Sequence, residues 1–400
     1  MTPGILLMFV LALSGIGFAV GRQRALSVAG GDARRLHSRP SYHGAAVLMF
    51  TAIPAVILLL AWVFLRPLLA PGVSAVAAPA AVAIAALAGL ALSALRIRID
   101  LRARNIVETL VIAILIGCSL IAVATTIGII ISLVFETVHF FQLYPAQDFF
   151  LSATWNPRFG GGSDLGLWPL LWGTLYVSLV ALVVAVPIGL MAAVYLSEYA
   201  SRRTRAFAKP AIEVLAGIPT IVYGLFALVT VGPFLRDWLA QPLGLGSSSS
   251  SVMTAGLVMG IMLIPFVSSL SDDIMNAVPQ AMRDGSYGLG ATQSETVRRV
   301  VLPAALPGIV GAILLAASRA IGETMIVVMG AGAAARLDLN PFEAMTTITV
   351  KIVSQLTGDT EFASPETLVA FALGLTLFCF TLVLNVLAMW IVRTYREQYE

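Results

Sequence analysis

Long apolar segments separated by short polar ones run through the whole chain. Nine segments are predominantly apolar: 4–20, 45–64, 74–95, 106–134, 168–196, 210–231, 252–270, 304–333 and 368–392. A helix needs about 20 apolar residues to cross the ~30 Å hydrocarbon core of a bilayer. Strands of a membrane barrel would instead alternate in segments of about 10 residues. The pattern therefore predicts an all-α polytopic membrane protein with about nine transmembrane helices.

The segment 341–356 has a different pattern. It places Phe342, Met345, Ile348, Ile352 and Val353 on roughly one helical face. We therefore expect a short amphipathic helix that lies at the outer membrane interface.

Basic residues are distributed unevenly between the polar segments. With nine spans, 18 of the 24 Lys and Arg residues fall on one side of the membrane. The other side has five, which are Arg66, Arg158, Arg236, Arg336 and Lys351. Cytoplasmic loops carry an excess of Lys and Arg, so we expect the N-terminus outside and the C-terminus in the cytoplasm. Without the alanine-rich span 74–95, two basic loops would lie on opposite sides, which is why we retain it.

The composition agrees with a membrane protein and excludes several other classes. The chain is 59% hydrophobic and 11% charged, with mean hydropathy +0.94, whereas soluble domains carry about 25% charged residues. The net charge of +3 comes from basic loops between spans, so it does not indicate a nucleic-acid partner. Two cysteines (Cys118, Cys379) and three histidines (His37, His43, His139) have no disulfide or metal-ligand spacing. We expect no cofactor, no metal site and, without a G-x-x-x-x-G-K-[ST] motif, no ATPase site in this chain.

The polar segment 271–303, between the seventh and eighth spans, has the most specific local pattern. We expect a helix over 278–289 that Gly290 ends in the left-handed conformation. Thr292 and Glu295 then have the spacing of a capping box, which would open a second helix. Pro303 marks the entry into the eighth span. A short rigid helix at this position can dock on a cytoplasmic partner.

The eighth span contains a basic and an acidic residue. Arg319 lies near the middle of 304–333, where an unpaired Arg costs at least ~2.5–3.5 kcal/mol. Glu323 follows one helical turn later, so we expect an ion pair on one helix face. Gly322 lets a ligand approach the backbone closely, and the guanidinium fork matches an oxyanion. The alternative is an ion pair that only holds helices together.

Both motifs resemble those of ABC importer permeases. The polar segment resembles the "EAA" coupling loop of this family, with Asp in place of Glu and Gly-Ser in place of Ala-Ala. The matching residues are Asp284, Gly285, Ser286, Gly290, Val300, Leu302 and Pro303. The stretch Arg-Ala-Ile-Gly-Glu-Thr at 319–324 resembles the signature of phosphate-specific permeases, and 325–329 resembles the PstC-type subunit. The segments 155–157 and 215–226 also resemble the phosphate permease pattern.

This resemblance implies a specific organisation. Residues 106–400 would form the six-span type I importer permease domain, with the coupling loop at 271–303. Residues 1–105 would be an N-terminal extension of about three spans, which departs from the family pattern and whose role stays open.

The resemblance also implies a function, which is the permease subunit of an ATP-driven phosphate importer in a bacterial inner membrane. Its partners would be a cytoplasmic ABC ATPase dimer, a second, PstA-type permease subunit, a periplasmic phosphate-binding protein and membrane lipid. The coupling-loop residues except Val300 would contact the ATPase. The substrate pathway would contain Arg319, Gly322, Glu323 and Thr324.

Three other functions stay open at this point. The first is an ABC permease for another oxyanion, such as molybdate or sulfate, although the 319–324 motif disfavours it. The second is a secondary transporter that runs without ATP, which would not need a coupling loop. The third is a role in reporting phosphate status, which is compatible with transport.

Overall fold

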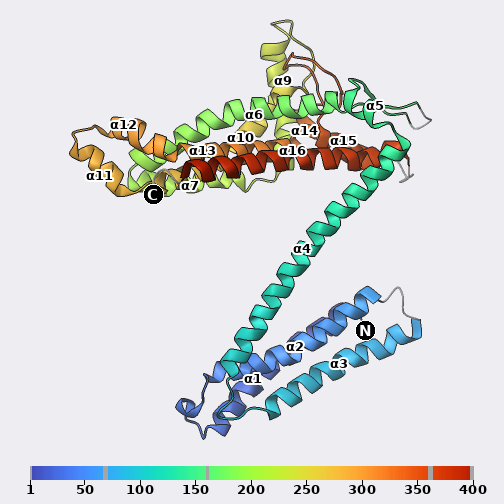
Figure 1. Ribbon diagram of the computed structural model, residues 1–400, viewed down its shortest axis with the longest axis vertical. Helices are drawn as coiled ribbons and strands as arrows, with labels where there is room; N and C mark the ends of the chain where they lie inside the picture. The colour runs from blue at the N-terminus through green and yellow to red at the C-terminus, as the bar shows by residue number, and fades with distance from the viewer. Residues whose placement is uncertain (1, 66–70, 159–161, 359–363, 397–400) are drawn as a thin grey trace. The chain divides into compact units, whose positions relative to one another are not determined.

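A computed structural model describes residues 2–65, 71–158, 162–358 and 364–396. The chain divides into two compact units, Met1–Gly128 and Ile129–Glu400 (Figure 1). Almost all of the described secondary structure is helical. Arg66, which the charge distribution assigns to the outer side, lies outside the described residues.

The first unit is built from three antiparallel helices and the start of a fourth. It contains α1 (Pro3–Val28), a 3-10 turn (Ala33–Arg35), α2 (Pro40–Leu65), α3 (Pro71–Leu95) and the first part of α4 (Ala103–Leu143). Small residues let these helices approach closely. A Cβ at Gly44 would lie 2.6 Å from the Phe18 carbonyl oxygen, and one at Gly89 would lie 2.2 Å from that of Phe50.

The second unit begins at one end of a helical bundle. There the last turns of α4 meet α5 (Ala146–Leu151) and a two-stranded antiparallel hairpin, β1 (Trp155–Asn156) and β2 (Asp164–Leu165). Phe140 and Phe149 are fully buried and pack edge to face at 5.6 Å between ring centroids. This aromatic cluster anchors the hairpin to the bundle.

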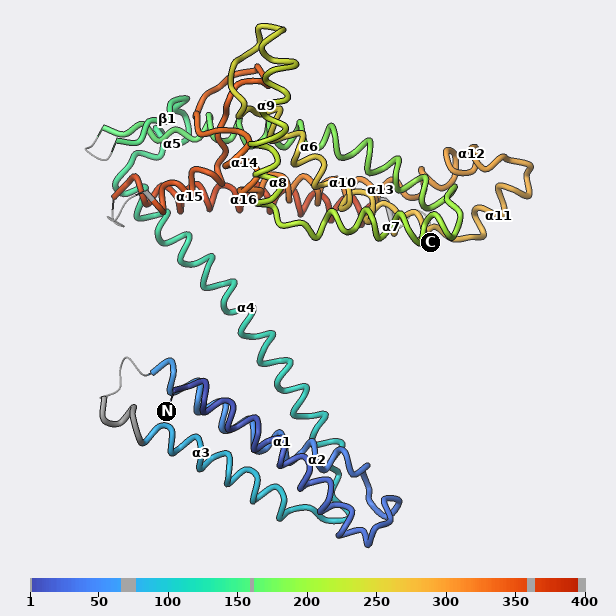
Figure 2. The backbone as a smooth tube through the Cα atoms, turned by 180° about the vertical axis from the view of Figure 1, so that it is seen from behind, coloured from blue at the N-terminus to red at the C-terminus, as the bar shows by residue number. Residues whose placement is uncertain are grey.

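Four long helices form the bundle: α6 (Trp168–Val194), α10 (Val252–Ala277), α13 (Leu302–Ile321) and α16 (Pro365–Arg396). They lie side by side in Figures 1 and 2. The α6–α10 contact is close because α10 presents glycines, and a Cβ at Gly256 would lie 2.5 Å from Val180. The central core of the unit includes Ala181, Val258 and Leu263, all fully buried.

Shorter helices complete the unit. The segment between α6 and α10 contains three short α-helices, α7 (Arg202–Ala216), α8 (Thr220–Phe226) and α9 (Gly232–Leu235). It also contains three π-helical segments, Tyr195–Tyr199, Ala227–Val231 and Arg236–Ala240. Between α10 and α13 are α11 (Gln280–Gly288), α12 (Gln293–Thr296) and a π-helical segment (Val297–Val301). Between α13 and α16 are α14 (Met325–Gly330) and α15 (Ile348–Gly358).

Nine helices in the described ranges are long and apolar enough to cross a membrane, which confirms the predicted number. They are Pro3–Val28, Pro40–Leu65, Ala77–Leu95, Ala103–Leu143, Trp168–Tyr199, Thr220–Ala240, Val252–Ala277, Gln293–Ile321 and Pro365–Thr394. The prediction of the all-α membrane fold is therefore correct.

The predicted sixth span, 210–231, is wrong in its position. The chain breaks between α7 and α8, and the apolar helix runs over Thr220–Ala240 instead. Gly217 ends α7, and Pro219, which has no N–H for a helical bond, takes ψ 137° directly before α8, so the helix is interrupted at this point. The stretch 202–216 forms a separate amphipathic helix with no buried residue.

The predicted amphipathic helix at 341–356 is also only partly correct. The helix begins at Ile348, and the residues before it form turns. Met345 and Ile348 are fully buried inside the unit rather than facing an interface. The apolar spacing reflected packing against the bundle, which helix periodicity alone does not distinguish from contact with lipid.

Candidate functional site

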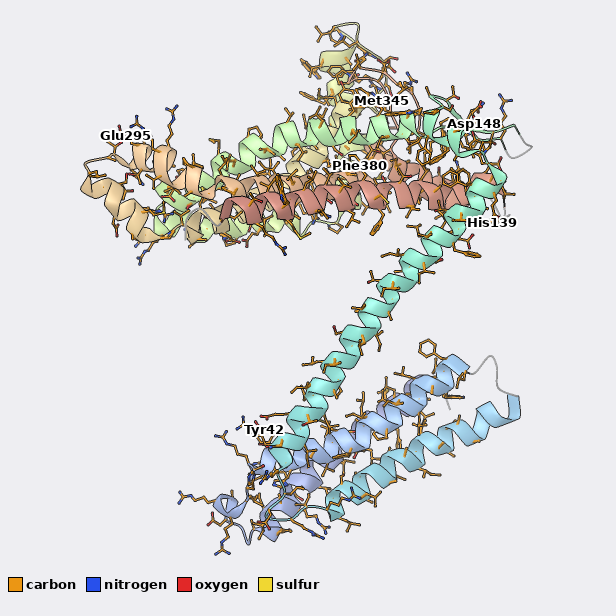
Figure 3. All side chains as sticks on the ribbon, viewed as in Figure 1. Tyr42, His139, Asp148, Glu295, Met345 and Phe380 are labelled. Atoms are coloured by element: carbon orange, nitrogen blue, oxygen red, sulfur yellow. The ribbon has the colours of Figure 1, made fainter. Side chains whose placement is uncertain are left out.

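The predicted coupling segment lies at one end of the second unit. In Figure 3, Glu295 lies at this end, and Asp148 lies at the opposite end of the bundle. Helix α11 ends as expected, because Gly290 adopts φ +86°, a conformation that residues with a Cβ rarely adopt. Thr292 and Glu295 form the predicted capping box, with each side chain bonded to the backbone N–H of the other. The local geometry of the segment is therefore encoded in its own residues.

A buried arginine that we did not predict fixes α11 to the bundle. The Arg283 guanidinium donates to the carbonyl oxygens of Val278 at 2.6 Å and Met275 at 2.8 Å. It also donates to Glu198 Oε1 at 3.0 Å, and the two charged side chains are only 10% and 7% exposed. These carbonyls belong to the end of α10, where helical partners are missing. Arg283 thus joins α10, α11 and the π-helical end of α6.

The predicted coupling residues fall into an exposed and a supporting set. Asp284 and Gly285 are exposed on α11, and no atom lies within 4 Å of a Cβ built at Gly285. The tip beside them carries Leu289, which is 92% exposed. Ser286 instead bonds Thr296 across the turn, at 2.9 Å between hydroxyl oxygens.

The two remaining coupling residues lie at the start of α13. Leu302 packs against the buried cluster that contains Met275 and Val301, and Pro303 occupies the first turn of the helix. Leu302 therefore stabilises the coupling segment through its packing against this cluster.

The basic helix α7 is attached to α10 by a buried acidic residue. Asp272, 1% exposed, accepts hydrogen bonds from Arg205 Nη2 at 2.9 Å and Lys209 Nζ at 2.8 Å. Asn276 Nδ2 donates to the same carboxylate at 2.9 Å. The hydrogen bond with Asp272 raises the pKa of Lys209 above its ordinary value. Because α7 buries no residue of its own, polar contacts attach it to α10.

Inside the bundle, the eighth span is broken rather than continuous over 304–333. Helix α13 ends at Ile321, residues 322–324 are non-helical, and α14 begins at Met325. The Glu323 carboxylate accepts from the Met325 N–H at 3.2 Å, and the Glu323 carbonyl accepts from Thr349 Oγ1 at 2.9 Å. These bonds satisfy backbone and side-chain groups at the break. Broken helices at membrane depth occur in transporters, where they form substrate sites.

The expected ion pair between Arg319 and Glu323 is not formed in the structure. The Arg319 guanidinium lies over the Phe266 ring, 5.6 Å from its centroid, and no ion pair to it is found within the described ranges. Residues 319 and 323 share a helix face only if the helix continues, and it ends between them. Instead, Arg319 lies in the last turn of α13 and Glu323 directly before α14, where the helix dipoles favour these charges.

The break nevertheless lies near the middle of the bundle's length, and the Arg319 side chain itself is exposed. Phe266 is near the middle of α10 (Val252–Ala277), and Ala320 belongs to the central core. Gly322 is exposed, with no atom closer than 3.6 Å to an added Cβ, and Thr324 is partly buried. The structure thus brings the four predicted pathway residues together at one helix break.

Lys351 is a basic residue near this region whose environment the sequence did not reveal. It lies in the first turn of α15, two residues after Thr349, and is partly buried. Burial lowers the pKa of its ammonium group. No group of three or more His, Cys, Asp or Glu side chains in the described part of the chain could hold a metal ion.

Comparison with known proteins identifies the family. Residues 185–397, more than half of the chain, match the family described as "Binding-protein-dependent transport system inner membrane component". Residues 7–83 match a second family, described as "Phosphate ATP-binding cassette transporter".

Curated relatives match well over half of the chain. The chain is 31% identical over 279 residues to a "Probable ABC transporter permease protein YqgH" of Bacillus subtilis (strain 168), covering 69% of this chain and 87% of the relative. It is 33% identical to the "Phosphate transport system permease protein PstC" of Mesorhizobium japonicum, covering 61% and 77%. It is 36% identical to "Phosphate transport system permease protein PstC 1" of Mycobacterium tuberculosis, covering 61% and 81%.

These matches agree with the fold, and they confirm the resemblance to PstC-type permeases. The chain belongs to the family of binding-protein-dependent transport system inner membrane components.

Proposed function

We propose that this chain is the permease subunit of an ATP-driven importer of inorganic phosphate. It forms the translocation pathway with a second, PstA-type permease subunit. A cytoplasmic ABC ATPase dimer drives it, and a periplasmic phosphate-binding protein delivers the substrate. Its N-terminus lies outside and its C-terminus lies in the cytoplasm, in accordance with the uneven distribution of basic residues.

The observation that carries the proposal is the geometry of the coupling segment. Helix α11 is short, rigidly held by Arg283 and closed by Gly290, and it exposes Asp284, Gly285 and Leu289 at its free side. A structure of this kind transmits force only if a partner receives it. A secondary transporter has no such requirement, so the segment favours an ATPase partner.

The choice of substrate rests on the relatives and on the helix break. The PstC relatives carry phosphate transport in their names, and the exposed Arg319 lies beside the break, level with Phe266 near the middle of α10. A guanidinium offers several donors in a planar fork that matches a tetrahedral oxyanion. Beside this guanidinium, Gly322 supplies an accessible backbone and Thr324 supplies a hydroxyl. In this proposal Arg319 meets phosphate during translocation.

Co-purification tests the assembly. The affinity-tagged chain should isolate together with an ABC ATPase and a second permease subunit, and cells that express it should take up radioactive phosphate. Purification of the chain alone from cells that express the partners would contradict the proposal. Uptake of sulfate or molybdate instead of phosphate would keep the ATPase assignment and overturn the substrate.

Substitution of Arg319 tests the pathway. Arg319→Gln should abolish phosphate uptake although the neutral side chain is easier to insert, and Arg319→Lys should restore little because an ammonium lacks the fork. Arg336→Gln, in the loop after α14, is the matched control and should transport normally. Normal uptake by the double variant Arg319→Met/Glu323→Leu at normal expression would exclude a transport role for both charges.

A further inference from the structure

The N-terminal unit contains a cavity that phosphate transport does not require. It has a volume of about 470 Å³ and lies between α2, α3 and the segment that leads into α4. Its walls are mainly apolar, with Val47, Phe50 and Pro54 from α2 and Leu92, Ile97 and Ile106 opposite them. Cavities of about 300–1,000 Å³ with apolar walls and few polar groups are typical ligand sites.

A buried histidine lines this cavity. His43 is fully buried, and neither of its ring nitrogens has a hydrogen-bond partner in the structure. A buried polar group without a partner is unfavourable and rare in folded proteins. A ligand in the cavity that carries a hydrogen-bonding group would satisfy the imidazole. The histidine therefore indicates an amphipathic ligand rather than a purely apolar one.

The cavity also has a positively charged edge. Arg96 lines it and is exposed, and its guanidinium makes no ion pair or hydrogen bond with another described residue. The segment 96–104 has four arginines and one acidic residue, Asp100, and only Arg104 pairs with a carboxylate, that of Glu108. The local charge thus favours an anion at the edge.

We propose that this cavity binds an anionic phospholipid. The acyl chain lies along the apolar walls, the headgroup phosphate lies at Arg96, and an ester or phosphate oxygen accepts a hydrogen bond from His43. Basic pockets between transmembrane helices bind acidic lipid headgroups in the same way. A free anion such as inorganic phosphate would leave the apolar walls without contact. This site is independent of the proposed transport function.

Native mass spectrometry of the full chain tests the site. The chain is purified from vesicles of phosphatidylcholine and phosphatidylglycerol, and the phosphatidylglycerol that stays bound is measured. Arg96→Gln should weaken its retention about fivefold, the effect of one basic residue near a membrane surface. Arg98→Gln, which removes an equally exposed charge that does not line the cavity, should leave retention unchanged.

Two further variants and one control test the cavity itself. Ala85→Trp fills it and should abolish retention, whereas Ala88→Trp on the exposed face of the same helix should not. His43→Phe roughly keeps the volume but removes the hydrogen bond to an ester or phosphate oxygen, which both lipids carry, and should therefore reduce the retention of both.

Three results would overturn the proposal: equal retention by Arg96→Gln and Arg98→Gln, equal binding of the two lipids, or displacement of the lipid by inorganic phosphate.

Discussion

Replacement of Arg283 by methionine tests how the coupling segment is held. The change removes the cation from Glu198, whose side chain is 7% exposed, and removes the guanidinium donor from the carbonyl oxygens of Val278 and Met275. The Met275 carbonyl keeps only the Val278 N–H, at 3.2 Å. Ser197 stays as a hydrogen-bond donor to Glu198, at 3.1 Å. Breaking a buried ion pair by removing one partner costs about 3–5 kcal/mol. At 1.4 kcal/mol per tenfold, attachment of α11 to the bundle should weaken by a factor of at least about 100.

A spin label at the exposed tip of α11 measures this effect. Leu289→Cys provides the site in a chain whose two native cysteines, Cys118 and Cys379, are replaced by serine, because both are exposed. In the Arg283→Met background the spectrum should sharpen as the label becomes mobile. Phosphate taken up per ATP hydrolysed by the assembled transporter should fall, because a loose helix transmits less movement.

Control variants separate the contacts of Arg283 from its charge. Arg298→Met removes an exposed arginine of the following π-helical segment and should change neither spectrum nor coupling. Arg283→Lys should be intermediate, because an ammonium cannot reach all three acceptors at once. The double variant Arg283→Met/Glu198→Gln should recover part of the loss, because no buried charge is left unpaired. An unchanged spectrum and normal coupling in Arg283→Met would refute the role given to this arginine.

Three other predictions follow from the structure. Gly290→Val should reduce ATPase binding because a β-branched residue at φ +86° is strained, while Gly290→Asn should bind nearly normally; equal binding by both in a pull-down would contradict this. In intact cells an impermeant maleimide should label a cysteine placed at exposed Ser247 but not one at exposed Ala33, and the reverse pattern would refute the topology. The hydrogen bond with Asp272 raises the pKa of Lys209 above its ordinary value of 10.5. The contact should therefore stay intact below pH 10.5 and be lost as the pH rises through the higher pKa of the folded protein. A fluorescent label on α7 should report this alkaline change, which Asp272→Asn should remove; a change already at neutral pH would argue against it.

Local sequence was sufficient to predict the number of spans and the local geometry of the coupling segment. Span number depends on the length of apolar runs, and the end of α11 depends on Gly290 and the Thr292–Glu295 spacing, all of which are readable from neighbouring residues. Helix ends inside the membrane were less predictable. The apolar pattern resumes directly after the polar residues at 319–324, so the whole segment 304–333 looked like a single span and hydropathy did not indicate the break at Gly322.

Contacts between distant residues were not predictable. Arg283 and Glu198 are 85 positions apart, and Arg205 and Asp272 are 67 apart. Each of these residues appears in the sequence as an ordinary loop charge, and only the packing of α10 against α6 and α7 brings the partners together. A single sequence contains no signal for such pairs.

The position of Arg319 over Phe266 has an electrostatic consequence. A carboxylate neutralises a guanidinium when it binds one, whereas an aromatic ring attracts it through a quadrupole and adds no net charge. Within the described residues, the Arg319 guanidinium therefore keeps its charge without a carboxylate partner in the resting structure. An anion that reaches this depth has no ion pair to break before it meets the cation. Fluorine atoms on the Phe266 ring would withdraw electron density from its face, and each added fluorine would loosen the hold on Arg319 without altering the charge or the shape of the pathway.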